Sequence, residues 1–223
     1  GRRVLNGGVT GYGFDQIVLR AEQLADIHRP SVIIVSFIED DVRRTEMRRM
    51  WWRDKPWFAI EGDELVLKGV PVPNRARLPL RIRHRLDGIL VDLPPLLQHL
   101  FGYHSRVHRA GRGLAVARRL VERLGRLRAR HDIQMVMMAQ YPPVVWVNKP
   151  VSNQQRRVTE AILDCASGHG FATLDTFQRL AAEPNPGKFY AVTHMNARGN
   201  SMIANLLAAA LPALLEGPRI AAS

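Results

Sequence analysis

The sequence has very little cysteine: Cys165 is the only one in 223 residues. A single cysteine excludes an internal disulfide and a zinc site built from cysteines. Cys165 stands in the segment TEAILDCASGHG, on the apolar side of a predicted helix. We therefore expect it to be a small buried hydrophobic residue rather than a nucleophile.

The chain also lacks an apolar run long enough to cross a bilayer, which takes roughly 18 residues. Its longest run, SMIANLLAAALPALL, is interrupted by Asn205 and Pro212 and predicts an amphipathic helix near the C-terminus. No secretory signal opens the sequence. We expect no transmembrane segment, and the sequence leaves both a cytoplasmic and a periplasmic or secreted location open.

Acidic residues are few: 20 Asp and Glu against 32 Lys and Arg leave a net charge of +12. The segment ARRLVERLGRLRAR alternates arginines with apolar residues, which is typical of a solvated helix face above an apolar stripe. A basic surface favours anionic substrates or a membrane surface, and nucleic acid is the other common partner. No nucleic-acid motif is present, so nucleic-acid binding, with its steep salt dependence, is the weakest hypothesis.

The apolar pattern predicts an α/β protein. A short strand at 2–6, a helix at 14–28 and an apolar strand at 31–37 form a strand–helix–strand unit, which favours a parallel sheet. Alternating helices and strands resume after Gly113. They are predicted at 113–130 (helix), 132–141 (strand), 151–170 (helix), 171–177 (strand) and 199–215 (helix). The pattern indicates one domain, residues 1–223.

Residues from about 42 to 110 depart from this pattern and form a predicted insertion. The segment WFAIEGDELVLK predicts a β-hairpin that turns at Glu61–Gly62–Asp63, and residues 87–105 predict a helical stretch. Trp51, Trp52 and Trp57 lie in the insertion. They could stack on a sugar ring or hold an acyl chain, or equally form a small apolar core beneath the insertion.

Four glycines cluster in VLNGGVTGYG, directly after the first predicted strand. Their spacing does not fit the dinucleotide fingerprint, and no lysine follows as in a phosphate-binding P-loop. The loop does place Asn6 and Gly8 at the carboxyl end of a predicted parallel strand, where ligands bind in open α/β sheets. We therefore predict that Asn6 and Gly8 belong to a binding site, and we expect no cofactor.

Asp40 and Asp41 follow the second predicted strand at the same edge of the sheet. A helix N-terminus explains such a pair equally well. A metal site would need further carboxylate or histidine ligands, and none is evident nearby, so we predict no metal. Although His104 and His108 share a helical face, Arg106 and Arg109 beside them argue against a metal there too.

His194 lies in YAVTHMNARGNSMIANLL, before a predicted polar turn at Asn196–Gly199 and a terminal helix. A histidine in apolar surroundings usually has a structural role. A loop that leads into a helix can instead direct the imidazole toward the edge of the sheet, so we predict that His194 is functional.

Together, VLNGGVTGYG, SFIEDDV and THMNARGNSMIA resemble three sequence blocks of the SGNH (GDSL-type) hydrolases. The resemblance extends over nearly the whole chain and implies a flavodoxin-like three-layer α/β/α sandwich with a mostly parallel sheet. It implies an oxyanion-hole role for Gly8, places Asp40 at the asparagine position of the family's oxyanion hole, and makes His194 the general base. The implied activity is ester hydrolysis, on an acylated carbohydrate or lipid.

The chain departs from the family pattern at three points. No Gly-Asp-Ser block precedes Gly8, so we expect the serine nucleophile and its strand upstream of Gly1. Ala191 and Val192 stand where the aspartate partner of His194 is expected. Asp40 replaces a neutral asparagine, and an ionised carboxylate would repel an oxyanion unless it is protonated, turned away or replaced by another donor. These departures also motivate an alternative, a non-catalytic domain that binds glycan or a protein partner.

Overall fold

The computed structural model describes residues 3–50, 53–72, 89, 93–94, 96–97 and 112–216. The chain divides into two compact units. We call Gly1–Arg20 with Asp40–Leu120 the loop unit, and Ala21–Glu39 with Val121–Ser223 the sheet unit. The boundary cuts helices α1 (Phe14–His28) and α5 (Arg112–His131) and meets the start of α2 (Glu39–Arg43).

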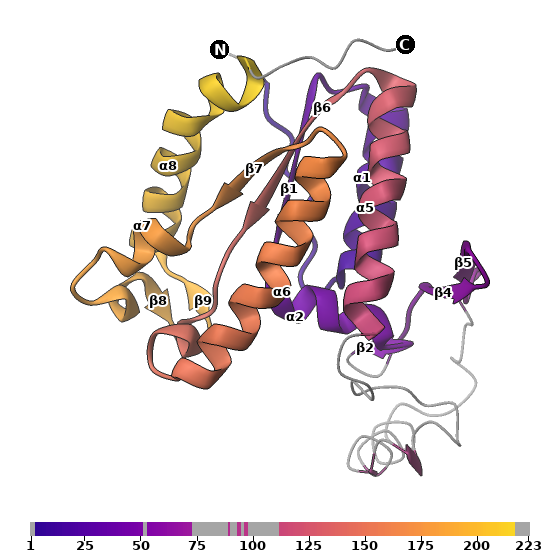
Figure 1. Ribbon diagram of the computed structural model, residues 1–223, viewed down its shortest axis with the longest axis horizontal. Coiled ribbons are helices and arrows are strands. Elements are labelled where there is room, and N and C mark those ends of the chain that lie inside the picture. Colours follow the sequence, from indigo (N-terminus) through magenta and orange to yellow (C-terminus); the bar gives the residue numbers. More distant parts are fainter. Residues whose placement is uncertain are drawn as a thin grey trace. The chain divides into compact units, whose positions relative to one another are not determined.

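The sheet unit contains a three-stranded parallel sheet in the order β1–β6–β7, built from β1 (Val32–Phe37), β6 (Gln134–Ala139) and β7 (Ala172–Asp175) (Figure 1). Strand β6 pairs with β1 from Val32↔Gln134 to Phe37↔Ala139, and with β7 from Val136↔Ala172 to Ala139↔Asp175. β6 is the most buried of the three strands: Met135 to Ala139 are all buried. The predicted α/β class and these three strands are confirmed.

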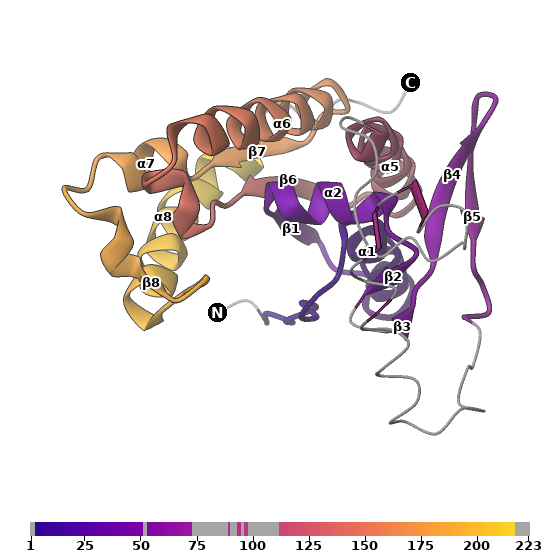
Figure 2. The ribbon, with the colours of Figure 1, turned by 90° about the horizontal axis from the view of Figure 1, so that it is seen from below.

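Two long helices cover the sheet. Figure 2 shows α6 (Lys149–Gly168) on one side and α8 (Ala197–Glu216) on the other. α6 begins at Asn148, whose side-chain oxygen accepts a hydrogen bond from the Val151 N–H at 3.1 Å, as an N-cap does. Cys165 lies on α6 and is half-buried rather than buried. Among the described residues, no helix is long and apolar enough to cross a membrane.

Shorter elements connect β6, β7 and α8. They are the 3-10 helix η2 (Pro143–Trp146), α7 (Phe177–Ala181), the 3-10 helix η3 (Pro186–Phe189) and the antiparallel hairpin β8 (Tyr190–Ala191) and β9 (His194–Met195). Buried Met138, Leu180, Phe189 and Ile203 form a core cluster that joins β6, α7, η3 and α8. This cluster holds the C-terminal segment, including the His194 hairpin, against the end of the sheet.

The loop unit contains short elements around the start of α1. They are η1 (Arg44–Glu46), β2 (Arg49–Met50), β3 (Arg53–Asp54), β4 (Trp57–Glu61) and β5 (Glu64–Lys68). The predicted hairpin is confirmed: β4 and β5 pair from Trp57↔Lys68 to Glu61↔Glu64, and Gly62 takes the left-handed φ of 59° that the turn requires. The predicted helix at 87–105 lies largely outside the described residues, as do Trp51, Trp52, His104 and His108.

The predicted strand at 2–6 is wrong for the residues that the structure describes. Residues 3–9 have no regular secondary structure, and Val4 is 89% exposed. An isolated extended segment does not form a strand, because its backbone N–H and C=O groups need a neighbouring strand as a hydrogen-bonding partner. No described strand pairs with this segment.

A buried ion pair fastens the insertion to the start of α1. The Lys55 ammonium contacts the Asp15 carboxylate, and both side chains are almost wholly buried. Burial raises the pKa of Asp15 and lowers the pKa of Lys55, while the attraction between the two charges opposes both shifts. The two groups depend on each other, because either charge alone would be buried without compensation.

We predict that Lys55→Met lowers the free energy of unfolding by about 3–5 kcal/mol, because it leaves the Asp15 carboxylate unpaired. The control is Lys68→Met on β5 of the same unit, which removes a half-exposed pair with Glu61 and should cost about 0–1 kcal/mol. Urea unfolding followed by circular dichroism measures both. Burial raises the pKa of Asp15, so its carboxyl group becomes protonated in the folded protein as the pH falls. The loss in the free energy of unfolding of Lys55→Met should therefore become smaller as the pH falls toward about 4. Equal losses in the two variants would contradict the assignment.

Candidate functional site

In the loop unit, the glycine loop forms a hydrogen bond between one of its own side chains and its own backbone. The Asn6 side-chain oxygen accepts a hydrogen bond from the Gly8 N–H at 2.9 Å. Gly11 has a left-handed φ of 80°, and a Cβ on Gly13 would lie 2.8 Å from an Asp15 carboxylate oxygen. Asn6 and Gly8 are thus hydrogen-bonded to each other, and the N–H predicted to bind an oxyanion already has an acceptor. An anion would have to displace the Asn6 amide.

Asp40 lies in the first turn of α2 and forms ion pairs with two arginines. Its carboxylate oxygens lie 2.5 Å from Arg43 Nη2 and 2.5 Å from Arg44 Nη2. The negative charge of the carboxylate is therefore compensated by two arginines. Among the described residues, no group of three or more His, Cys, Asp or Glu side chains could hold a metal ion.

Arg44 connects Asp40 to the glycine loop. Besides Asp40, its guanidinium contacts Asp41 Oδ1 at 3.1 Å and donates a hydrogen bond to the Tyr12 carbonyl at 3.3 Å. The Arg44 side chain also lies against Gly13, where an added Cβ would come within 2.9 Å of it. Within the loop unit, Arg44 therefore connects Asp40 to the glycine loop. The sequence analysis did not identify Arg44, and the only local signal was the pair of arginines after DDV.

His194 lies in the sheet unit, on strand β9. It pairs with Ala191 of β8 across a two-residue turn, Val192–Thr193, and its side chain is exposed. No described carboxylate forms an ion pair or hydrogen bond with it. The predicted polar turn at Asn196–Gly199 is wrong. Asn196 instead caps α8, which begins at Ala197, and its side-chain oxygen accepts a hydrogen bond from the Gly199 N–H at 3.0 Å.

Two hydrogen bonds tie the His194 hairpin to the carboxyl end of β6. The Tyr190 hydroxyl donates to the Tyr141 carbonyl at 2.8 Å and accepts from the Trp146 indole N–H at 3.2 Å. Tyr141 follows β6 by two residues and is buried, and burial raises its pKa. Rings of Tyr141, Trp146 and Phe177 contact one another beneath the hairpin. The imidazole is thus carried on a hairpin anchored at the carboxyl edge of the sheet.

Polar side chains also join the strand ends themselves. The Gln140 side-chain amide donates to Ser36 Oγ at 2.6 Å, linking the ends of β6 and β1. The Thr176 hydroxyl donates to the Ala139 carbonyl at 2.8 Å, linking β7 to β6. These contacts are formed by residues from three distant parts of the sequence, and the sequence pattern did not identify them.

The four predicted site residues fall in both units: Asn6, Gly8 and Asp40 in the loop unit, His194 in the sheet unit. Comparison of the chain with protein-family models, with curated proteins and with solved structures found no match.

We predict that Tyr190→Phe loosens the His194 hairpin, because it leaves the Trp146 N–H and the Tyr141 carbonyl without their shared partner. The expected loss is about 1–3 kcal/mol in the free energy of unfolding. Amide hydrogen exchange at Tyr190–Met195 should quicken. The matched control is Tyr12→Phe, which deletes a tyrosine hydroxyl in the loop unit and leaves this tether intact. Unchanged exchange in Tyr190→Phe would show that the hairpin is held by other contacts.

Proposed function

We propose that this protein is a serine ester hydrolase of the SGNH type, in which His194 is the general base. The substrate class is an acyl ester of a carbohydrate or lipid. In this proposal the fold is a flavodoxin-like three-layer sandwich, and the nucleophilic serine lies upstream of Gly1, because the serine block precedes the glycine block in this family.

The observation that carries the proposal is the anchoring of the His194 hairpin at the carboxyl end of β6. Parallel α/β sheets bind ligands at that edge. A general base must also be held within hydrogen-bonding reach of the group that it deprotonates. The paired hydrogen bonds of Tyr190 and the buried cluster of Met138, Leu180, Phe189 and Ile203 supply that rigidity. Exposure of the imidazole leaves it accessible to a substrate.

The order of the chain around the sheet also supports the proposal. Asp40 follows β1 by three residues, and His194 follows β7 after α7 and η3. The strand order β1–β6–β7, with helices on both sides, is compatible with three neighbouring strands of a flavodoxin-like sheet. Because the three strands are parallel, their carboxyl ends meet at one edge of the sheet, which is the edge where ligands bind in such folds.

The proposed reaction proceeds by acyl transfer. The serine oxygen attacks the ester carbonyl while His194 accepts the serine proton, and His194 then returns the proton to the leaving alcohol. The Gly8 N–H stabilises the oxyanion once the Asn6 amide has been displaced. Water, deprotonated by His194, then releases the carboxylic acid and regenerates the serine.

A non-catalytic domain that binds glycan or protein is the second candidate, and three observations favour it. The Gly8 N–H is engaged by Asn6, Asp40 is engaged by Arg43 and Arg44, and no described carboxylate orients His194. The hydrogen bond of Gly8 and the ion pairs of Asp40 occupy groups that a catalytic site would leave free to bind substrate. This candidate predicts glycan or partner binding without turnover, unchanged by His194→Ala.

The test uses the protein expressed from its natural start and p-nitrophenyl acetate and butyrate as substrates. We predict that His194→Ala lowers kcat/KM by roughly 100-fold or more, because a positioned general base contributes about that much. His169→Ala is the matched control, since His169 is an exposed histidine at the C-terminal end of α6 and should leave the rate unchanged. Absence of hydrolysis by the natural protein would overturn the proposal.

A second variant tests the missing carboxylate. Val192 is 93% exposed and has a left-handed φ of 57°, a conformation that aspartate and asparagine adopt more readily than valine. We predict that Val192→Asp raises kcat by roughly tenfold, because it supplies a carboxylate two residues before His194. Val192→Asn has a similar shape and no charge, so it isolates the effect of the carboxylate. Equal rates for the two variants would show that a carboxylate at this position does not assist His194.

A further inference from the structure

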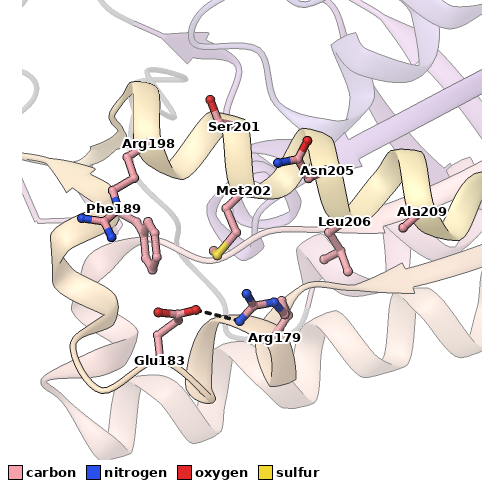
Figure 3. Close-up of a pocket in the computed structure, with 9 residues that line it drawn as sticks. All are labelled: Arg179, Glu183, Phe189, Arg198, Ser201, Met202, Asn205, Leu206 and Ala209. Carbon is pink, nitrogen blue, oxygen red and sulfur yellow. Dashed lines mark hydrogen bonds and ion pairs between the residues drawn. The ribbon is translucent and has the colours of Figure 1, made fainter.

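An open pocket of about 540 Å³ lies between α7 and α8 in the sheet unit. Figure 3 shows Met202 and Leu206 directed from α8 toward the ion pair between Arg179 of α7 and Glu183, which lies two residues after that helix. Phe189 lies at one end and Ala209 toward the other. Phe189, Met202, Leu206 and Ala209 form the apolar part of its lining. Arg179, Glu183 and Arg198 form the charged part, and Ser201 and Asn205 add neutral polar groups from α8. The volume is in the range of small-molecule pockets.

The apolar wall is a continuous face of α8. Arg198, Met202, Leu206 and Ala209 follow one another at helical spacing, so they share one side of the helix. At 1.5 Å per residue this face extends roughly 16 Å. Between Gly199 and Leu215 the sequence of α8 contains no charged residue. The face is thus cationic at its start and uncharged over the following three turns, where Ser201 and Asn205 lie beside the apolar side chains.

The positive charges around the pocket outnumber the negative ones. Glu183 accepts hydrogen bonds from Arg179 at 2.8 Å and from Lys188 at 2.9 Å, which lower its pKa and keep it ionised. One carboxylate is therefore shared by two cations. Arg198 adds a third positive charge and has no carboxylate partner among the described residues. Its guanidinium lies 5.7 Å from the centre of the Phe189 ring.

We infer that this pocket binds a single-chain carboxylate amphiphile, a medium-chain fatty acid. The carboxylate pairs with Arg198 beside Phe189, where the positive charge is uncompensated. The acyl chain lies along Met202 and Leu206 toward Ala209, removing apolar surface from water. The inference uses only the sheet unit and does not depend on the proposed ester hydrolysis.

Isothermal titration calorimetry of the full protein with decanoate, below its micellar concentration and at low salt, tests the site. We expect one decanoate per chain. Decanol lacks the charge, acetate lacks the tail, and decyltrimethylammonium carries the opposite charge, so each should bind at least about tenfold more weakly. Decanol binding as tightly as decanoate, or no decanoate binding, would overturn the inference. Binding to phosphatidylglycerol vesicles but not to monomeric decanoate would overturn it too, in favour of a membrane surface.

Two variants locate the ligand. Arg198→Gln should weaken decanoate binding about tenfold, whereas Arg157→Gln, an exposed arginine on α6 outside the pocket, should not. Ala209→Phe fills the far end of the pocket at an exposed position, so it should weaken binding of dodecanoate more than binding of octanoate. Circular dichroism verifies that each variant is folded. Unchanged affinity in Arg198→Gln together with unchanged chain-length preference in Ala209→Phe would place any bound decanoate elsewhere.

Discussion

Strand β6 is hydrogen-bonded to a parallel strand on each side, and the rest of the sheet unit depends on this pairing. Because the three strands run in the same direction, their carboxyl ends meet at one edge. Gln140 and Thr176 then link the ends to each other, and Tyr190 ties the C-terminal hairpin to Tyr141. His194 acquires its position in this way, through the backbone pairing of β8 and β9, although no hydrogen bond of its imidazole is found among the described residues.

The loop unit uses polar groups differently. Its glycine loop, Asp40 and Arg44 form a closed set of hydrogen bonds and ion pairs, and the buried pair of Asp15 and Lys55 fixes the insertion beside it. Such a site is rigid before any ligand arrives. Its donors must exchange partners to bind an anion, and this exchange lowers affinity unless the anion forms stronger, charge-assisted hydrogen bonds. This internal pairing also distinguishes the two candidate functions, because a hydrolase needs the Gly8 N–H to be released from Asn6 whereas a binding domain does not.

Local patterns in the sequence predicted the elements that depend on local forces. The apolar run of β1, the periodicity of α1 and the turn at Gly62 were all identifiable, because burial and backbone conformation act over a few residues. The strand expected at 2–6 was wrong because strand formation depends on a neighbour that the segment itself does not specify. Asn196 was assigned to a turn because asparagine is equally common in turns and at helix N-caps.

The candidate site shows the same division. Asn6 and Gly8, which were identified from the sequence, are two residues apart and are joined by a local hydrogen bond. Arg44, Lys55 and Tyr190 were missed, since each acts through a partner 32, 40 or 49 residues away. Contacts over such separations follow from the fold and leave no local periodic signal. The pocket beside α8 belongs to this class as well, because its charge and its apolar wall come from α7, η3 and α8 together.

The central claim is that His194 activates a serine in this protein. Intact-protein mass spectrometry after exposure to a fluorophosphonate tests it most directly, because such reagents phosphonylate a serine that a neighbouring base has activated. For the protein expressed from its natural start, we predict one adduct per chain, on a serine preceding Gly8. The same adduct should be absent in His194→Ala. No labelling, or equal labelling in His194→Ala, would contradict it.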